Sequence, residues 1–208
     1  MIADLHGYFP KETITADMLL IGGDICPVWN HHISFEKEWL NNEFKGWLEK
    51  QEVKHIVFTP GNHDIIFEKN PELVPKLNWH CLIDKEIIIE NLKIYGSPWQ
   101  PIFYNWAFNL EEGELEKKWE LIPNNIDILL LHGPPFNIMD SAPKGELFEH
   151  TGSVSLRKKI LDIKPKCVIF GHIHGQYGKK VQKNIKFFNA SLLNEQYKMV
   201  NKPIYIDI

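Results

Sequence analysis

Short apolar runs alternate with amphipathic segments along the chain. From Phe35 to about Lys50, apolar residues recur at helical spacing, and Ser34 is the expected N-cap. Four other runs have the length and the continuous apolar character of buried strands: 18–21, 55–59, 126–131 and 167–170. Apolar strands that alternate with helices predict an α/β protein with a mixed sheet system.

The other elements are shorter and less regular. Residues 86–95 alternate around Asn91, which predicts a hairpin. Ser153 or Ser155 is expected to cap a helix that runs to Ile163. Segments 71–77 and 114–121 predict short helices, 136–152 has the polar composition of a loop, and short strands are expected near 185–189, 196–199 and 203–207.

Metal-binding side chains follow the expected strands. Gly22-Gly23-Asp24 follows the apolar run 18–21, and Gly61-Asn62-His63-Asp64 follows the run 55–59. Open α/β sheets place ligands at the carboxyl ends of their strands, so these side chains are expected to meet. The set consists of Asp4, His6, Asp24, Asn62, His132, His172 and His174. Only three residues precede Asp4, so its strand is either a stub or begins upstream of the given sequence.

Imidazole and carboxylate ligands suit divalent transition metals, and two such ions about 3.5–4 Å apart can clamp a phosphoryl group. Asp24 is the residue expected to bridge the two ions, because the two glycines before it let the backbone approach the metal site closely. Two divalent ions with the charges of Asp4 and Asp24 leave a local balance of about +2, which favours an anionic substrate.

The order DxH, GD, GNHD, H and GHxH resembles the calcineurin-like metallophosphoesterase family. Four further segments resemble its small members, which include animal brain proteins with cyclic nucleotide phosphodiesterase activity: 93–99, 106–109, 128–135 and 189–191. The resemblance implies a single domain over 1–208, with a four-layer α-β-β-α sandwich of two mixed sheets flanked by helices. It also implies a first metal held by Asp4, His6, Asp24 and His174, and a second held by Asp24, Asn62, His132 and His172.

His63 lies between an expected ligand and a carboxylate. We expect it to act as the acid that protonates the leaving oxygen, with Asp64 orienting its ring, and the resemblance also implies a catalytic histidine here. The alternative is a structural histidine that satisfies the loop backbone. For Asp64, the alternative is a residue that only caps a turn.

Four residues are weaker candidates for substrate contacts. His31 and His32 follow Asp24 in the chain, and an exposed loop is an equally good interpretation of both. Trp99 and Phe103 come from an aromatic segment that could stack on a base, although packing in the core explains most of its rings.

Composition narrows the function classes. Of the 208 residues, 44% are apolar and 24% are charged, as is usual for one globular domain. The formal charge of −4 and the lack of a basic run give no footprint for extended nucleic acid. Three scattered cysteines indicate a reducing compartment, and no signal peptide or membrane span is visible, so the expected location is the cytoplasm.

These observations together predict a dinuclear metal-dependent phosphodiesterase. The expected reaction is attack by a hydroxide that bridges two manganese, iron or zinc ions, with manganese expected in vitro and a 2′,3′- or 3′,5′-cyclic nucleotide as substrate. A phosphomonoesterase or small-molecule pyrophosphatase would use the same site. A non-catalytic interaction module is the alternative of another class. Partners beyond the small phosphoester are not indicated, and a homodimer is left open.

Overall fold

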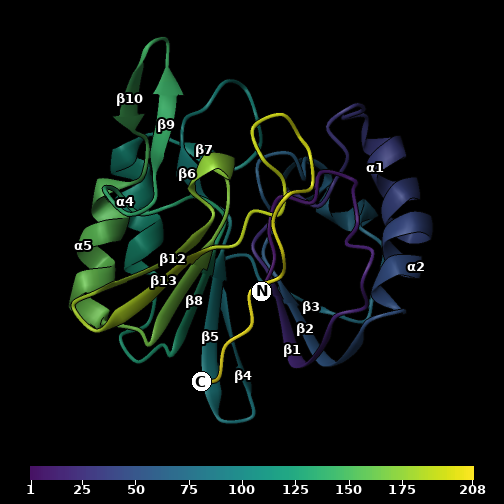
Figure 1. Cartoon of the computed structure of the whole chain (residues 1–208), viewed down its shortest axis with the longest axis horizontal. Coiled ribbons are helices and arrows are strands. Elements are labelled where there is room, and N and C mark those ends of the chain that lie inside the picture. Colours follow the sequence, from purple (N-terminus) through teal and green to yellow (C-terminus); the bar gives the residue numbers. More distant parts are fainter.

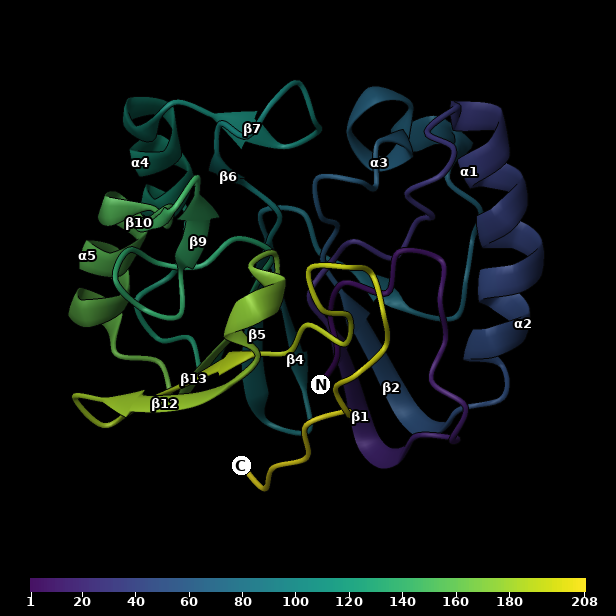
Figure 2. The same cartoon turned by 45° about the horizontal axis from the view of Figure 1, so that its top comes forward.

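The computed structural model describes residues 1–208, apart from the side chain of Lys144. Two β-sheets lie against each other in the centre, and helices cover the outer face of each sheet (Figure 1). Turning the molecule keeps α1 and α2 on one side and α4 and α5 on the other (Figure 2). The α/β class and the layer order of the expected sandwich are confirmed.

The smaller sheet contains β1 (Thr15–Ile21), β2 (Glu52–Phe58) and β3 (His80–Cys81), which pair in parallel in that order. The long strands β1 and β2 are exposed where they begin and buried over their last three residues. Both strands therefore enter the core as they approach the loops that carry Asp24 and Asn62.

The larger sheet has the order β12-β13-β11-β8-β5-β4. Its inner strands are parallel, and the edge strands β4 and β12 pair antiparallel with their neighbours. Strands β8 and β11 are buried along their whole length, which explains their continuous apolar sequences. The bounds are β4 (Lys85–Ile89), β5 (Leu92–Ser97), β8 (Ile128–Leu131), β11 (Cys167–Phe170), β12 (Gly178–Gln182) and β13 (Ile185–Asn189).

The helices pack through aromatic and aliphatic side chains. On the small sheet, α1 (Ile33–Trp39), a π-helical segment (Leu40–Phe44) and α2 (Lys45–Leu48) follow one another and bury Trp39, Phe44 and Trp47. On the large sheet lie α4 (Glu112–Glu120) and α5 (Val154–Ile163). Among the helices that the structure describes, none is long and apolar enough to cross a membrane.

Several expected boundaries are confirmed. The hairpin turns at Glu90 and Asn91, which both have positive φ. Ser153 caps α5, since its hydroxyl accepts a hydrogen bond from the backbone N–H of Leu156 at 3.1 Å. Ser34, however, is not an N-cap: the helix begins at Ile33 after His32, which makes no side-chain cap.

Other expectations are wrong. The helix expected over 71–77 is only a 3-10 turn at Pro71–Leu73, because Pro75 forces Val74 into an extended conformation. The expected loop 136–152 contains the hairpin of β9 (Ser141–Lys144) and β10 (Leu147–His150). The expected strands at 196–199 and 203–207 are irregular in the structure, whereas β12 was not expected. Four short elements complete the fold: α3 (Ile66–Lys69), β6 (Gln100–Pro101), β7 (Asn109–Leu110) and a 3-10 turn (His174–Gln176).

Residues 1–3 form a short link between the sheets. Ile2 makes a parallel bridge with Ile21 at the end of β1, and Ala3 makes one with Ser191, just beyond β13. The expected first strand is therefore limited to two isolated bridges within the described chain. Asp4 follows directly and lies where the two sheets meet.

Candidate active site

The loops after four parallel strands and after the 1–3 link converge at one end of the two sheets. They carry all seven expected ligands, and Asp4, His6, Asp24, Asn62 and His132 are buried there. His172 and His174 are partly buried. The sequence-based prediction that these side chains meet is therefore correct as geometry, although their binding of metal stays a prediction.

Four of the expected ligands have left-handed backbone conformations. The φ angles are 54° at Asp4, 45° at His6, 53° at Asp24 and 68° at His172. Residues other than glycine adopt such angles at a cost of order 1–3 kcal/mol each, and they persist where the surrounding structure holds them. All four follow a strand or bridge within three residues, at the points where the chain turns into the site.

One group of potential ligands contains Asp4, His6 and His174, whose ligand atoms lie within 4.8 Å of one another. The Nε2 atoms of His6 and His174 are 3.1 Å apart, and His174 Nε2 lies 3.5 Å from Asp4 Oδ1. His174 Nδ1 lies 3.0 Å from the backbone carbonyl of Asn194. A neutral His174 must donate from Nδ1, so its Nε2 presents a lone pair to the other two side chains.

The second group contains Asn62, His132 and Asp24. His132 Nδ1 lies 2.9 Å from the carbonyl of Gly22, which makes it the donor in a neutral ring. His132 Nε2 then faces Asn62 Oδ1 at 2.8 Å and Asp24 Oδ2 at 3.4 Å. Three acceptors facing one another repel unless a proton or a metal ion lies between them, and a set of one imidazole, one amide oxygen and one carboxylate fits a divalent metal.

The electrostatics of His132 agree with this need for positive charge. Burial alone would lower its pKa, but the carboxylates of Asp24 and Asp4 and the carbonyl of Gly22 together outweigh burial and raise the pKa to about 9. His172, whose ring centroid lies 5.1 Å from that of His132, has its pKa lowered to about 3 by burial and by His132. Without a metal, a proton on His132 therefore supplies the positive charge that the carboxylates favour, whereas the His172 ring stays neutral, as a ligand requires.

Surrounding groups fix the two carboxylates. Asp4 accepts hydrogen bonds from the N–H of His172 at 3.0 Å and from the hydroxyl of Ser191 at 2.6 Å. Asp24 Oδ1 accepts from the N–H of His63 at 2.7 Å. Ser191 was not among the sequence-based site residues, although it belongs to the 189–191 segment that carries the family resemblance.

His63 is 8% exposed and lies beside these groups. One of its ring nitrogens lies within 4.8 Å of ligand atoms of His6 and Asp24. Its Nδ1 lies 3.0 Å from Nε2 of His31, and its ring centroid is 4.3 Å from that of Trp106. Burial lowers the pKa of His63.

The expected role of Asp64 must be corrected. Its carboxylate accepts hydrogen bonds from the backbone N–H groups of Ile25 at 2.9 Å, Cys26 at 2.8 Å and Gly61 at 2.8 Å. These bonds join the loop after β1 to the loop after β2. The partner of the His63 ring is His31, so Asp64 shapes the loops that carry the site and does not orient His63.

A cleft of about 440 Å³ opens onto the site. Phe103 lines it, and its ring centroid is 5.6 Å from that of His172, while its contact with substrate stays a prediction. His32 is exposed and outside the cleft lining. Trp99 is a packing residue: its indole N–H donates to Asp84 at 2.8 Å, and Lys118 Nζ lies 4.1 Å above its ring.

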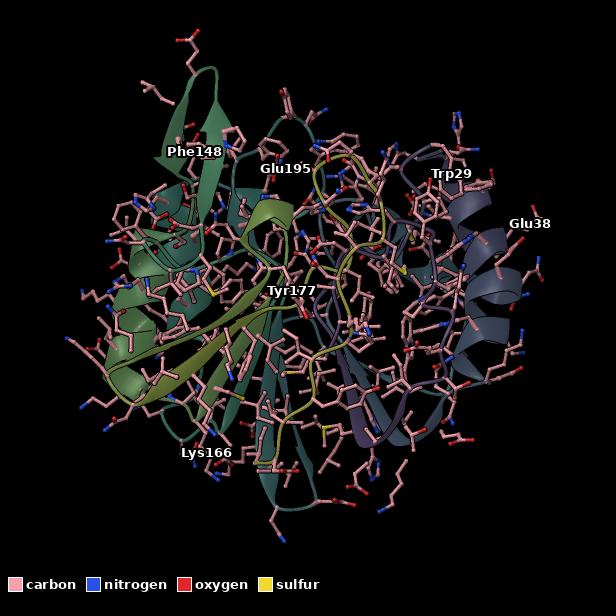
Figure 3. The ribbon with its side chains drawn as sticks, viewed as in Figure 1. Trp29, Glu38, Phe148, Lys166, Tyr177 and Glu195 are labelled. Carbon is pink, nitrogen blue, oxygen red and sulfur yellow. The ribbon has the colours of Figure 1, made fainter. Side chains whose placement is uncertain are left out.

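The cleft also has walls that the sequence did not reveal. Tyr197 places its ring centroid 5.1 Å from that of His6 and 5.4 Å from that of His174. The hairpin β9–β10 contributes Pro143 and Glu149 to the lining, and it projects from the body of the molecule with Phe148 exposed (Figure 3). Neither contribution had a signal in the sequence, because both segments are short and polar.

Comparison with known proteins gives a consistent result. The family model described as calcineurin-like phosphoesterase matches residues 1–176. Human metallophosphoesterase domain-containing protein 1 is 34% identical over 193 residues, which cover 80% of this chain and 59% of that protein. A UPF0046 protein of Caenorhabditis elegans is 40% identical over an alignment of 227 residues, which covers 92% of this chain and 54% of that protein.

The chain thus spans a little over half the length of these curated relatives. Among solved structures, a phosphopantetheinyl hydrolase from Mycobacterium tuberculosis has a TM-score of 0.56 at 13% identity, with 94% of this chain and 89% of that chain covered. This structural likeness concerns the fold alone.

Proposed function

The chain belongs to the calcineurin-like phosphoesterase family, a family of metal-dependent phosphoester hydrolases, and from this premise we propose that it hydrolyses a small phosphodiester. A 2′,3′- or 3′,5′-cyclic nucleotide is the substrate that we favour. The observation that carries the proposal is the set of facing acceptors at His132, Asn62 and Asp24, next to a second group at Asp4, His6 and His174.

Two divalent ions bound there would act as Lewis acids on the phosphoryl group and on the attacking water. We assign Asp4, His6, Asp24 and His174 to one ion, and Asp24, Asn62, His132 and His172 to the other. Asp24 is the proposed bridge, because its Oδ2 lies 3.6 Å from His6 Nε2 and 3.4 Å from His132 Nε2. Manganese is the ion that we propose for assays in vitro.

His63 is the proposed general acid. As the bond from phosphorus to the leaving oxygen breaks, the ring gives its Nε2 proton to that oxygen, and solvent later returns a proton to the ring. Its position beside Asp24 and His6 supports this role.

The lining of the cleft supports a diester over a monoester. Among the described side chains that line it there is no lysine or arginine, whereas Glu149 and Glu195 are present. A monoester carries about two negative charges at pH 7 and a diester one, so the diester fits this lining better. Phe103 and Tyr197 offer apolar ring surfaces for a nucleobase.

The three cysteines carry free thiols, which fits the reducing cytoplasm that we propose as the location. The test of function is a hydrolysis panel on metal-stripped protein reloaded with manganese. It includes bis(4-nitrophenyl) phosphate, 4-nitrophenyl phosphate and both kinds of cyclic nucleotide. Metal-dependent cleavage of diesters is expected, and cleavage of the monoester alone would refute the proposal in favour of a phosphomonoesterase.

Variants identify the roles within the same panel. His63→Ala is expected to keep both metals and to lower kcat by about 10²–10⁴-fold on the cyclic nucleotide, whose alkoxide leaving group needs a proton. Asp24→Ala is expected to lose both metals, and retention of two equivalents would contradict the bridging position. His80→Ala, at an exposed histidine of β3, is the matched control and should behave as the wild type.

A further inference from the structure

Two histidines from different loops meet at the edge of the site. His31 follows the strand β1 by ten residues, and His63 lies in the loop after β2. His31 Nε2 and His63 Nδ1 are 3.0 Å apart, which is a hydrogen-bond distance. His31 is partly buried and His63 is almost fully buried, so water competes weakly for this contact.

Trp106 fixes both rings. Its ring centroid lies 4.3 Å from that of His63 and 4.8 Å from that of His31. The backbone N–H of the next residue, Ala107, donates to the carbonyl of Asn62 at 3.1 Å, so Trp106 is anchored to the loop that carries His63. The rings of the two histidines therefore have little freedom to rotate.

We propose that His31 is a positioning residue for His63, which it holds by accepting a hydrogen bond from Nδ1–H of that ring. The inference rests on the proposed role of His63 as general acid. It assigns to His31 the task that a carboxylate often performs for a catalytic histidine, because the nearby carboxylate, Asp64, is already bonded to three backbone N–H groups.

The hydrogen bond determines which nitrogen faces the reaction. With Nδ1–H of His63 bonded to His31, Nε2 is the nitrogen that transfers a proton to the leaving oxygen. After the transfer, the neutral His63 ring keeps its proton on Nδ1 and its bond to His31. A neutral His31 that accepts at Nε2 carries its own proton on Nδ1, so the pair adds no negative charge to the site.

Two substitutions of His31 separate the hydrogen bond from simple packing. His31→Phe keeps a ring against Trp106 but has no acceptor for His63. His31→Gln keeps a polar group that can accept at the position of the lost Nε2. Both variants are assayed with manganese. Their metal content is also measured and should equal that of the wild type, because His31 is not one of the proposed ligands.

The decisive readout is the dependence on the leaving group. Bis(4-nitrophenyl) phosphate releases 4-nitrophenolate, which needs little protonation, whereas diphenyl phosphate releases phenol, which needs more. His31→Phe is expected to lower kcat about 10-fold or more on diphenyl phosphate and less than about 3-fold on the nitrophenyl ester. His31→Gln is expected to recover most of the loss, with KM unchanged throughout.

Equal losses on both substrates would overturn the inference, since a structural defect does not distinguish leaving groups. An unchanged His31→Phe enzyme would overturn it as well. The double variant His31→Phe/His63→Ala should be no slower than His63→Ala alone, because a positioning residue acts only through its partner. Additive losses would contradict this.

The failure of this inference is distinguishable from failure of the proposed function. If His63→Ala lowers turnover of diphenyl phosphate strongly and His31→Phe does not, only the role of His31 is wrong. If His63→Ala changes neither rate, or the loaded protein cleaves no diester, the proposed function itself is wrong.

Discussion

Glu36 is a buried carboxyl group whose ionisation should weaken the fold. It lies on α1 with 0% exposure, and Oε2 accepts a hydrogen bond from the backbone N–H of Ile66 at 2.8 Å, whereas Oε1 has no hydrogen-bond partner. The bond ties α1 to the first turn of α3, directly after the loop of His63. Burial, with a smaller contribution from Asp64, raises the pKa of Glu36 from 4.5 to about 8.

The sign of the pH effect follows from this shift. The folded protein holds the proton up to about pH 8, whereas the unfolded chain loses it near pH 4.5. The contribution of Glu36 to the free energy of unfolding is therefore greatest below pH 4.5, and it decreases as the pH rises to about 8. One pKa unit corresponds to about 1.4 kcal/mol, so the loss between about pH 5.5 and 8.5 is of order 3 kcal/mol.

Glu36→Gln removes this titration and keeps the shape of the side chain. Relative to the wild type, the free energy of unfolding of the variant should rise by about 2–3 kcal/mol between about pH 5.5 and 8.5. Urea unfolding at a fixed manganese concentration measures the difference at each pH. Glu38→Gln is the control, because Glu38 projects from the same helix into solvent (Figure 3). If wild type and Glu36→Gln change in parallel over this range, the reasoning is refuted.

Three further predictions concern the loops and the ions. Gly171→Ala would place a Cβ on Asp4 Oδ2, so metal analysis should find less metal than in the wild type. The control is Gly113→Ala, in open space on α4, which should keep the metals and raise the free energy of unfolding in urea by about 0.5–1 kcal/mol. Asp64→Asn should lower the free energy of unfolding by about 2–4 kcal/mol, because an amide NH₂ would face backbone donors; an unchanged unfolding curve would contradict this. Chelation should lower the melting temperature and manganese should restore it, with a smaller gain in His132→Ala; equal gains would show that His132 does not hold the ion.

The convergence of the seven expected ligands could be predicted because it depends on local features. Five of the ligands follow a short apolar strand, Asp4 and His6 follow the 1–3 link, and parallel strands end at the same edge of their sheets. The chemistry of the side chains then indicates the kind of site. Neither step requires knowledge of how the loops pack.

The partner of His63 could not be predicted, because it depends on packing between loops. His31 is 32 residues away in the chain, and only the folded loops bring its Nε2 to His63. Asp64, adjacent in sequence, was the natural expectation, but three backbone donors engage its carboxylate. The sequence alone does not reveal that backbone N–H groups engage this carboxylate.

The hairpin β9–β10 was missed for a different reason. All four residues of β10 are exposed, so the strand has no buried face to leave an alternating pattern of apolar and polar residues. Helix α1 begins at Ile33 instead of the expected Phe35, because His32 precedes the helix without a side-chain cap that the sequence could reveal.

The distance in sequence between the groups around Asp4 has a consequence for biosynthesis. Asp4 is bonded to the N–H of His172, 168 residues later, and to the hydroxyl of Ser191, 187 residues later. A ribosome adds about 5–20 residues per second, so Asp4 is synthesised roughly ten seconds or more before Ser191. The proposed ligand set is therefore complete only late in synthesis, and retention of the ions would report that both sheets have closed around the first residues.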